Sequence, residues 1–189
     1  MVEGQVIARS TVEFETRLSL LEKGAMSAAV DPLPADARHA GLQSVIDRWL
    51  LVKEGERLQL EAPSDEVVAA RVGRLRMKFP SAERFEAFLS LHEVDREGLG
   101  AALRRMGISE LVLESKLRGR TRVEPAELRR ARLQRPDVAG MDDGRLAALL
   151  ERERARSLVA FELARLRSHA KVKVFQGVAE PDGGEGGRN

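Results

Sequence analysis

The sequence predicts a mainly α-helical protein: a multi-helix lobe with a small two-stranded β pairing of its terminal segments and a long C-terminal helix. Three observations predict this fold. Apolar residues recur at three- and four-residue intervals over most of the chain. Helix start signals and proline or glycine stops separate these periodic stretches. The hydrophobic fraction of 43% and the charged fraction of 33% suit a globular protein with a strongly charged surface.

The first elements are a short β-prone stretch, 4–9, and a helix that directly follows it. Ser10 and Glu13 have the spacing of a capping box, in which Ser10 caps the helix and Glu13 reaches back to the Ser10 amide. This helix should run to about Lys23, where Gly24 stops it, and residues 25–35 should form a loop.

Three further helices are predicted before residue 95. The second helix begins near Asp36 and fades near Leu58. Pro63 to Glu66 start the third, which Pro80 ends, and Ser81 opens a short fourth helix. Their predicted inward-facing residues are Leu42, Val45, Ile46, Trp49, Leu50, Val68, Val72, Leu75, Phe79, Phe85, Phe88 and Leu89.

The second half contains two long helices separated by a shorter one. Asp95 caps a long helix in which Gly107 is either tolerated or marks a break. Pro125 occupies the favoured first position of the next helix. The interruption at 136–144 precedes a long helix over about 142–169.

The two ends of the chain are predicted to meet. Residues 171–175 alternate polar and apolar side chains, as a half-buried strand does. Two short β stretches in a helical chain need partners, so we expect Val6–Arg9 to pair with Val172–Phe175. Residues 1–176 then form one domain, and the glycine-rich segment 177–189 is a disordered tail.

Charge and cysteine content narrow the possible functions. Residues 104–135 contain ten Arg or Lys and four Glu, a local charge of +6 in a chain of net charge +2. Such a band attracts nucleic acid, acidic lipid or acidic protein, or is simply a solvated helix face. The chain has no cysteine, which excludes disulfides and thiolate metal sites. We also find no apolar run of about 20 residues that would span a membrane.

We identify no catalytic, cofactor-binding or metal-binding residue and expect no enzyme activity. The three histidines, His39, His92 and His169, each lack a carboxylate pair at metal-ligand spacing. The acidic pairs Asp65-Glu66 and Asp142-Asp143 both lie at predicted helix N-termini, where capping explains them. The sequence contains no phosphate-binding glycine loop and no nucleophile elbow.

One segment has the pattern of a helix-turn-helix. Residues 103–111 resemble the turn and the start of the second helix, and Arg118, Arg120 and Arg122 follow, in position to contact phosphates. The alternative interpretation is one continuous helix that tolerates Gly107. A DNA-binding regulator is therefore a second functional hypothesis, although nucleic acid is not the partner we expect.

The order of several short motifs resembles the N-terminal domain of the SurA family of periplasmic chaperones. The motifs are Ile46-Asp47-Arg48-Trp49-Leu50-Leu51, Pro63-Ser64-Asp65-Glu66-Val67, Phe79-Pro80-Ser81, Glu83-Arg84-Phe85-Glu86-Ala87-Phe88-Leu89 and Val123-Glu124-Pro125-Ala126-Glu127-Leu128. Residues 155–175 are similar to the family's C-terminal segment, which returns to complete its N-terminal domain. The resemblance covers about residues 4–176.

The resemblance implies a chaperone of the trigger factor/SurA peptide-binding fold without its parvulin-type isomerase. Family members usually carry that domain where this chain has only the loop 136–144, and the isomerase histidines have no counterpart here. His92 stands where the family tends to have glycine. The resemblance further implies a periplasmic location with a signal peptide already removed, a role in outer-membrane protein assembly and no cofactor.

The implied partners are unfolded or extended polypeptides. The residues that bind them are unknown, since the family's client-binding positions do not form a motif. Exposed Met and Leu would be sensible candidates. The methionines Met26, Met77, Met106 and Met141 nevertheless have the placement of core or loop residues. A third hypothesis is an adaptor that holds one folded partner, and the oligomeric state stays open.

Overall fold

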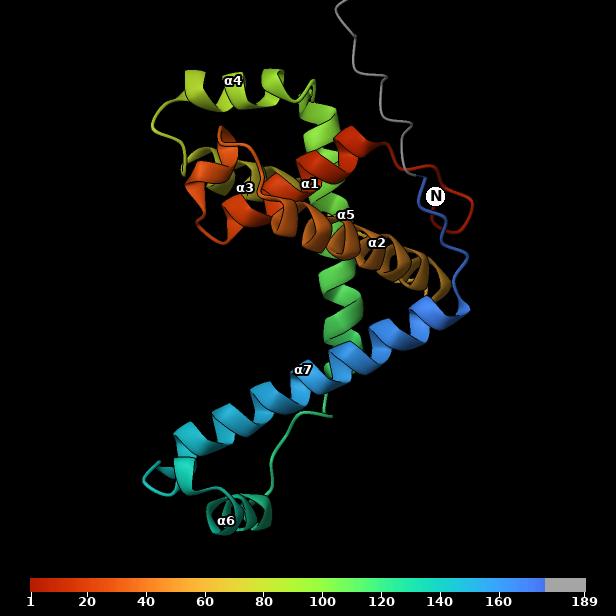
Figure 1. Ribbon diagram of the computed structural model, residues 1–189. Coiled ribbons are helices and arrows are strands. Elements are labelled where there is room, and N and C mark those ends of the chain that lie inside the picture. Colours follow the sequence, from red (N-terminus) through yellow and green to blue (C-terminus); the bar gives the residue numbers. More distant parts are fainter. Residues whose placement is uncertain (176–189) are drawn as a thin grey trace, which may run out of the picture.

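The structure, a computed structural model, describes residues 1–175, which form seven α-helices and two short 3-10 helices (Figure 1). The predicted mainly α-helical fold is confirmed. The elements are α1 (Arg9–Glu22), η1 (Met26–Ala29), α2 (Ala35–Arg57), α3 (Asp65–Arg76), α4 (Ala82–Leu91), α5 (Arg96–Leu117), α6 (Pro125–Gln134), η2 (Pro136–Val138) and α7 (Asp143–His169). The prediction of a disordered tail at 177–189 concerns residues outside this range.

Most helices begin where the sequence places them, because short polar side chains cap them. The N-cap side chains of Ser64, Ser81, Asp95 and Asp142 each accept a hydrogen bond from a backbone N–H in the first helical turn. Pro125 begins α6 as predicted. Local start signals therefore set five of the seven α-helix N-termini among the described residues.

The predicted capping box at the first helix is wrong. Helix α1 begins at Arg9, and its N-cap residue, Ala8, makes no side-chain hydrogen bond. Ser10 consequently lies inside the first turn. The Glu13 carboxylate instead accepts hydrogen bonds from the Arg17 guanidinium, one turn later on the same helix. The Arg17 side chain, four residues after Glu13, is thus its partner in place of the Ser10 amide of the predicted capping box.

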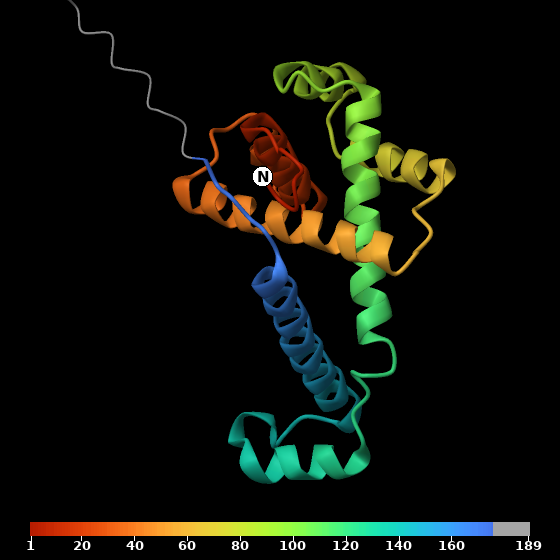
Figure 2. The same cartoon turned by 90° about the vertical axis from the view of Figure 1, so that its right-hand side faces the viewer.

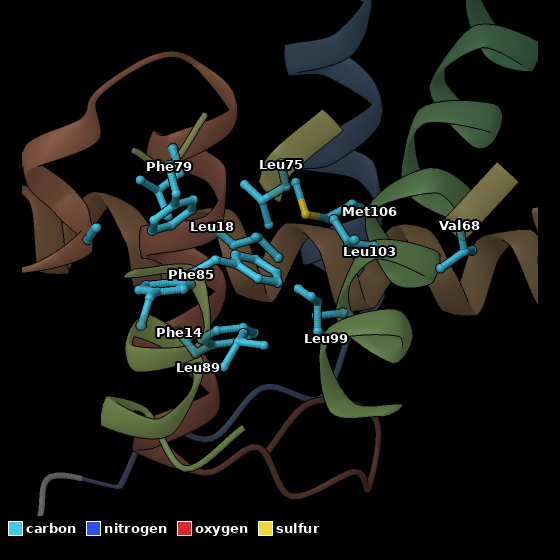
Figure 3. Close-up of a cluster of buried hydrophobic side chains, with 14 residues drawn as sticks. Phe14, Leu18, Val68, Leu75, Phe79, Phe85, Leu89, Leu99, Leu103 and Met106 are labelled. Atoms are coloured by element: carbon cyan, nitrogen blue, oxygen red, sulfur yellow. The ribbon is translucent and has the colours of Figure 1, made fainter. Parts of the chain in front are cut away.

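The main hydrophobic core lies between α1, α3, α4 and α5 (Figure 3). Its centre contains aromatic rings that pack edge-to-face or tilted, such as Phe79 against Phe85, with ring centroids 5.4 Å apart. The buried members are Phe14, Leu18, Leu21, Ala29, Val68, Leu75, Phe79, Phe85, Phe88, Leu89, Leu99, Ala102, Leu103 and Met106. The helical spacing predicted the buried residues of α3 and α4 correctly, but Phe79, which was expected inside the third helix, lies after the end of α3 at Arg76.

Two glycines, one in α2 and one in α5, allow neighbouring segments to pack closely against these helices. A Cβ at Gly41 would lie 2.2 Å from the Thr16 Oγ1 atom, so only glycine allows α1 and α2 to cross at this distance. A Cβ at Gly107 would lie 2.6 Å from the Pro63 side chain. Helix α5 runs through Gly107 without interruption, so the turn of a helix-turn-helix does not form there.

A fully buried carboxylate joins three helices of the body. The Glu15 side chain of α1 accepts hydrogen bonds from Arg48 of α2 (2.6 Å) and from Arg105 of α5 (2.7 and 2.9 Å). Arg48 also donates to the Ser19 hydroxyl, and the Arg105 guanidinium lies over the Trp49 ring. Each buried charge therefore has a partner, as burial requires.

A second ion-pair network attaches α7 to the body. Glu54 of α2 accepts hydrogen bonds from Arg57, Lys116 of α5 and Arg165 of α7. Glu162 of α7 pairs with the same Lys116 and Arg165. The second half of α7 is therefore held against both long helices of the body, which the two views of the molecule show it reaching (Figures 1 and 2).

Residues 125–150 form an arm that projects from the body beyond the end of α5 (Figure 1). It comprises α6, η2 and the first turns of α7, and it has its own small core. The buried centre of that core is Ala131, Val138 and Leu146, against which Leu128, Met141, Leu149 and Leu150 pack. The loop predicted at 136–144 thus contains a 3-10 helix and supplies part of this core.

The predicted two-stranded β pairing does not form in residues 1–175. Instead, an isolated bridge joins Val2 to Val172. Val2 precedes the segment 6–9 that was the predicted partner. The bridge is short because a tight turn, with Glu3 at φ 47° and Gly4 at φ 82°, folds the N-terminal residues back on themselves. The two ends of the described chain nevertheless lie side by side (Figure 2).

Candidate binding groove

A groove of about 550 Å³ lies beside the paired terminal segments. Its walls come from the N-terminal residues before α1, from α1, from the loop before α2, from the first half of α2 and from the segment 172–175. The apolar lining residues are Met1, Val2, Ile7, Val12, Leu33, Ala35, Leu42, Val45, Ile46, Val172, Val174 and Phe175. Mostly apolar walls with few polar groups are typical of binding sites.

The floor of the groove lies where α1 and α2 cross. Thr16, which touches Gly41 at the crossing, also lines the groove, and its hydroxyl donates to the Val12 carbonyl oxygen at 2.7 Å. Because the hydroxyl is used internally, this part of the floor offers mainly methyl and aliphatic surface. Above it, Val12 and Leu42 face the groove from the two helices.

One wall depends on an arginine that fixes the loop before α2. The Arg17 guanidinium donates hydrogen bonds to the carbonyl oxygens of Ala28 (2.8 Å) and Asp31 (2.9 Å). It also donates to the Glu13 carboxylate, and this hydrogen bond lowers the pKa of Glu13 below its ordinary value. The loop is thereby tied to α1, and Leu33, which is buried, lies beside the groove.

The opposite wall is the C-terminal segment, which crosses in front of the first half of α2 (Figure 2). It is anchored by a second hydrophobic cluster whose buried centre is Val2, Ile46 and Leu50. Leu166 and Val172 pack against that centre. Beyond this anchor, Val174 and Phe175 are 57% and 72% exposed, which makes them apolar surface beside the groove.

The rim of the groove is mainly basic. Arg9, Arg38 and Lys173 line it and form no salt bridge with any residue in the range 1–175. Its acidic member, Glu13, is paired with Arg17. The unbalanced charge at the rim is therefore positive and would favour a partner with acidic groups at its edges.

The three histidines occupy separate places, and only His39 lines the groove. His92 ends α4, where its ring packs against Phe14 and Phe88, and burial lowers its pKa. His169 lies in the last turn of α7, and its Nδ1 atom is 2.8 Å from the Arg165 carbonyl oxygen. His92 therefore packs among aromatic side chains, and His169 lies at the C-terminal end of a helix.

The acidic pairs singled out from the sequence serve helix ends and ion pairs. Asp142 caps α7, and Asp143 pairs with Arg132 of the arm. Asp65 begins α3 and pairs with Arg104. Across residues 1–175, no group of three or more His, Asp or Glu side chains is placed to hold a metal ion.

Much of the basic band at 104–135 is engaged within the protein. Arg105 and Lys116 belong to the two networks described above, and Arg135 pairs with Asp137 and Glu153. Arg129 and Arg130 remain exposed on α6. The band is therefore not one continuous binding face, since several of its charges join elements of the fold.

The methionines confirm their predicted placement in core or loop positions. Met106 is buried in the main core, Met26 packs beside it and Met141 packs in the arm. Met77 is exposed just after α3. None of the four lines the groove. Within the described range, no helix combines the length and apolar character needed to cross a membrane.

Comparisons with known proteins identify no relative of this chain. No protein-family model, no curated protein and no solved structure matches the chain. The resemblance to SurA-type chaperones therefore stays a prediction from the order of the motifs quoted above.

Proposed function

We propose that this protein is a periplasmic chaperone of the SurA type that binds unfolded or extended polypeptides and has no isomerase activity. The observation that carries the proposal is the groove: an apolar floor and walls, exposed Val174 and Phe175, and a basic rim. Exposed apolar surface in a hollow marks an interaction site, and the chaperone that we propose would use it for weak, separate contacts with apolar stretches of its clients. Clients in outer-membrane protein assembly are the class that the motif order implies.

The return of the C-terminal segment supports the same proposal. In the SurA family this segment completes the N-terminal domain, and here residues 171–173 lie against Met1–Glu3. The groove is built by both ends of the described chain, so the segment with the family resemblance also supplies one of its walls.

The test is suppression of aggregation of a denatured outer-membrane protein. The intact protein at several-fold excess should keep the client from scattering light. Phe175→Ser should weaken suppression about tenfold, because the phenyl ring contributes roughly 1–2 kcal/mol of apolar contact. Phe161→Ser is the matched control, since this ring is similarly exposed, on α7 and away from the groove.

Two outcomes would contradict the proposal. If the client aggregates as fast with excess protein as without it, a chaperone function is excluded. If Phe161→Ser weakens suppression as much as Phe175→Ser, the client contacts α7 and the groove is not the site. Titration with duplex DNA at low salt addresses the regulator hypothesis, for which binding should fall steeply as salt rises.

A further inference from the structure

The C-terminal segment has one hydrogen-bonded edge. The Met1 amino group and carbonyl oxygen bond to the carbonyl oxygen and N–H of Lys173, at 2.7 and 2.9 Å. The Glu3 N–H donates to the Lys171 carbonyl oxygen at 3.1 Å, and the Lys171 N–H donates to the Glu3 carboxylate. Lys171 and Lys173 thus direct their main-chain groups toward the N-terminal residues.

The opposite edge of the same segment is open. In an extended chain, successive residues direct their N–H and C=O groups to opposite edges. Val172 and Val174 therefore present theirs away from Met1–Glu3, and these groups make no hydrogen bond to any residue in 1–175. Unpaired strand edges of this kind pair readily with another chain.

This open edge belongs to a segment that lines the groove. Residues 172–175 all contribute to its lining, so an added strand would lie along a surface with apolar walls. Side chains of a strand alternate between its two faces, so every second residue of an added chain could face the groove. The basic rim residues Arg9 and Arg38 would lie near its flanks.

We propose that the groove binds a polypeptide by strand addition to the Val172–Val174 edge. The occupant is an extended segment of another protein, with apolar side chains at alternate positions and acidic residues flanking them. This inference rests on the proposed function, that the groove binds polypeptides, and adds how it does so. Main-chain pairing supplies affinity that is independent of sequence, while the apolar wall and basic rim select among segments.

Modified peptides test the pairing directly. The probe is a nine-residue peptide of alternating valine and threonine with aspartate at each end. Two derivatives are compared. One carries N-methyl groups on the amides of its odd-numbered residues, and the other carries them on the amides of its even-numbered residues. Because only one set of amides faces the edge, one derivative should lose at least about tenfold in affinity and the other should bind like the parent. Equal losses would overturn strand addition.

A variant of the protein tests the same edge from the other side. Val174→Pro removes an N–H on the open edge and leaves the amides of Lys171 and Lys173 in place. It also suits an extended conformation at Lys173. Peptide affinity should fall at least about tenfold, whereas the control Val174→Thr, which keeps the N–H, should change it less than threefold. Circular dichroism and thermal unfolding establish that both variants fold.

The outcomes separate this inference from the proposed function. If Val174→Pro binds the peptide and suppresses aggregation like the unmodified protein, polypeptide binding stands and strand addition is wrong. If the unmodified protein neither binds peptides nor suppresses aggregation, the proposed function itself fails. If light scattering finds a dimer that Val174→Pro dissociates, the edge pairs with a second copy, and the inference is also overturned.

Discussion

At the scale of single residues, the position of Glu15 is the least expected feature. Its carboxylate is fully buried on the face of α1 that also carries Leu18 and Leu21. Two arginines compensate this charge, Arg48 of α2 and Arg105 of α5. A charge in such a place specifies which helices meet there, because any other packing would leave it unpaired.

Glu15→Ala should therefore lower the free energy of unfolding by about 3 kcal/mol or more, since it leaves two arginines without their shared partner. The control is Glu86→Ala, which removes an exposed ion pair with Arg96 and should cost no more than about 0.5 kcal/mol. Urea unfolding followed by circular dichroism measures both. Equal effects of the two substitutions would show that the buried network adds no stability.

Two glycines should respond in opposite directions to the same substitution. Gly41→Ala places a methyl group against Thr16 and should destabilise the protein by about 1–3 kcal/mol. Gly73→Ala adds a methyl group on the exposed surface of α3, with nothing within 4 Å, and should stabilise it by about 0.5–1 kcal/mol. Melting temperatures of the two variants should fall on either side of the unmodified value, and a shift of the same sign in both would contradict the crossing geometry.

The sequence predicts most helix N-terminal ends well, but it does not predict the buried ion pairs of Glu15. Ser64, Ser81, Asp95 and Asp142 act on backbone amides three residues away, so a local pattern suffices to find them. The partners of Glu15 lie 33 and 90 residues away. The residues one turn from Glu15 on α1 are Thr11, Val12, Leu18 and Ser19, a mixture of polar and apolar side chains, so no local pattern marks Glu15 as buried.

At the scale of elements, ion pairs add to the apolar contacts of Leu166 in holding α7 against the body. Its contacts include the Glu54 network and a pair between Arg167 and Asp47. Hydrogen bonds from Arg57, together with those from Lys116, lower the pKa of Glu54 to about 2. A carboxylate whose pKa is lowered in the folded state contributes stability above its unfolded pKa, and that stability is lost as the pH falls toward the folded value.

The stability of the protein should thus decline between about pH 5 and pH 2, and Glu54→Gln should reduce that decline. At pH 7 the variant should melt at a lower temperature than the unmodified protein, and the gap should narrow as the pH falls. Glu56→Gln, which alters an exposed pair with Lys53, should follow the unmodified profile. Thermal unfolding from pH 2 to 7 measures all three, and a gap that stays constant with pH would contradict the assignment.

The arrangement of the elements also explains why the candidate groove could not be predicted from the sequence. The alternating pattern at 171–175 predicts a strand paired with 6–9, whereas Met1–Glu3 is the segment that meets it, through a single bridge. Alternating side chains identify an extended segment without identifying what pairs with it. The groove then arises from the crossing at Gly41 and from the loop held by Arg17, which are tertiary features with no local sequence signature.

At the scale of the whole molecule, the arm and the body have separate hydrophobic cores. Leu146 is fully buried in the arm, and Leu18 is fully buried in the main core. The separation of the two cores means that each can lose packing without directly exposing the other.

Leu146→Ala should accordingly raise hydrogen exchange in residues 125–150 and leave the amides of α1 and α2 protected. Leu18→Ala should instead lower global stability by about 2–5 kcal/mol, because it leaves a cavity in the main core. Exchange measured by mass spectrometry on proteolytic fragments distinguishes the two. Increased exchange throughout the body of Leu146→Ala would mean that arm and body unfold together.

The bridge between the two ends also has a consequence for the order of folding. Met1 and Lys173 are 172 residues apart, and closing so long a loop is entropically expensive until the helices between them have packed. The terminal segments should consequently join late, after the body has formed. The groove is therefore incomplete throughout most of folding, and it reaches its final shape only when the last contacts of the fold have formed.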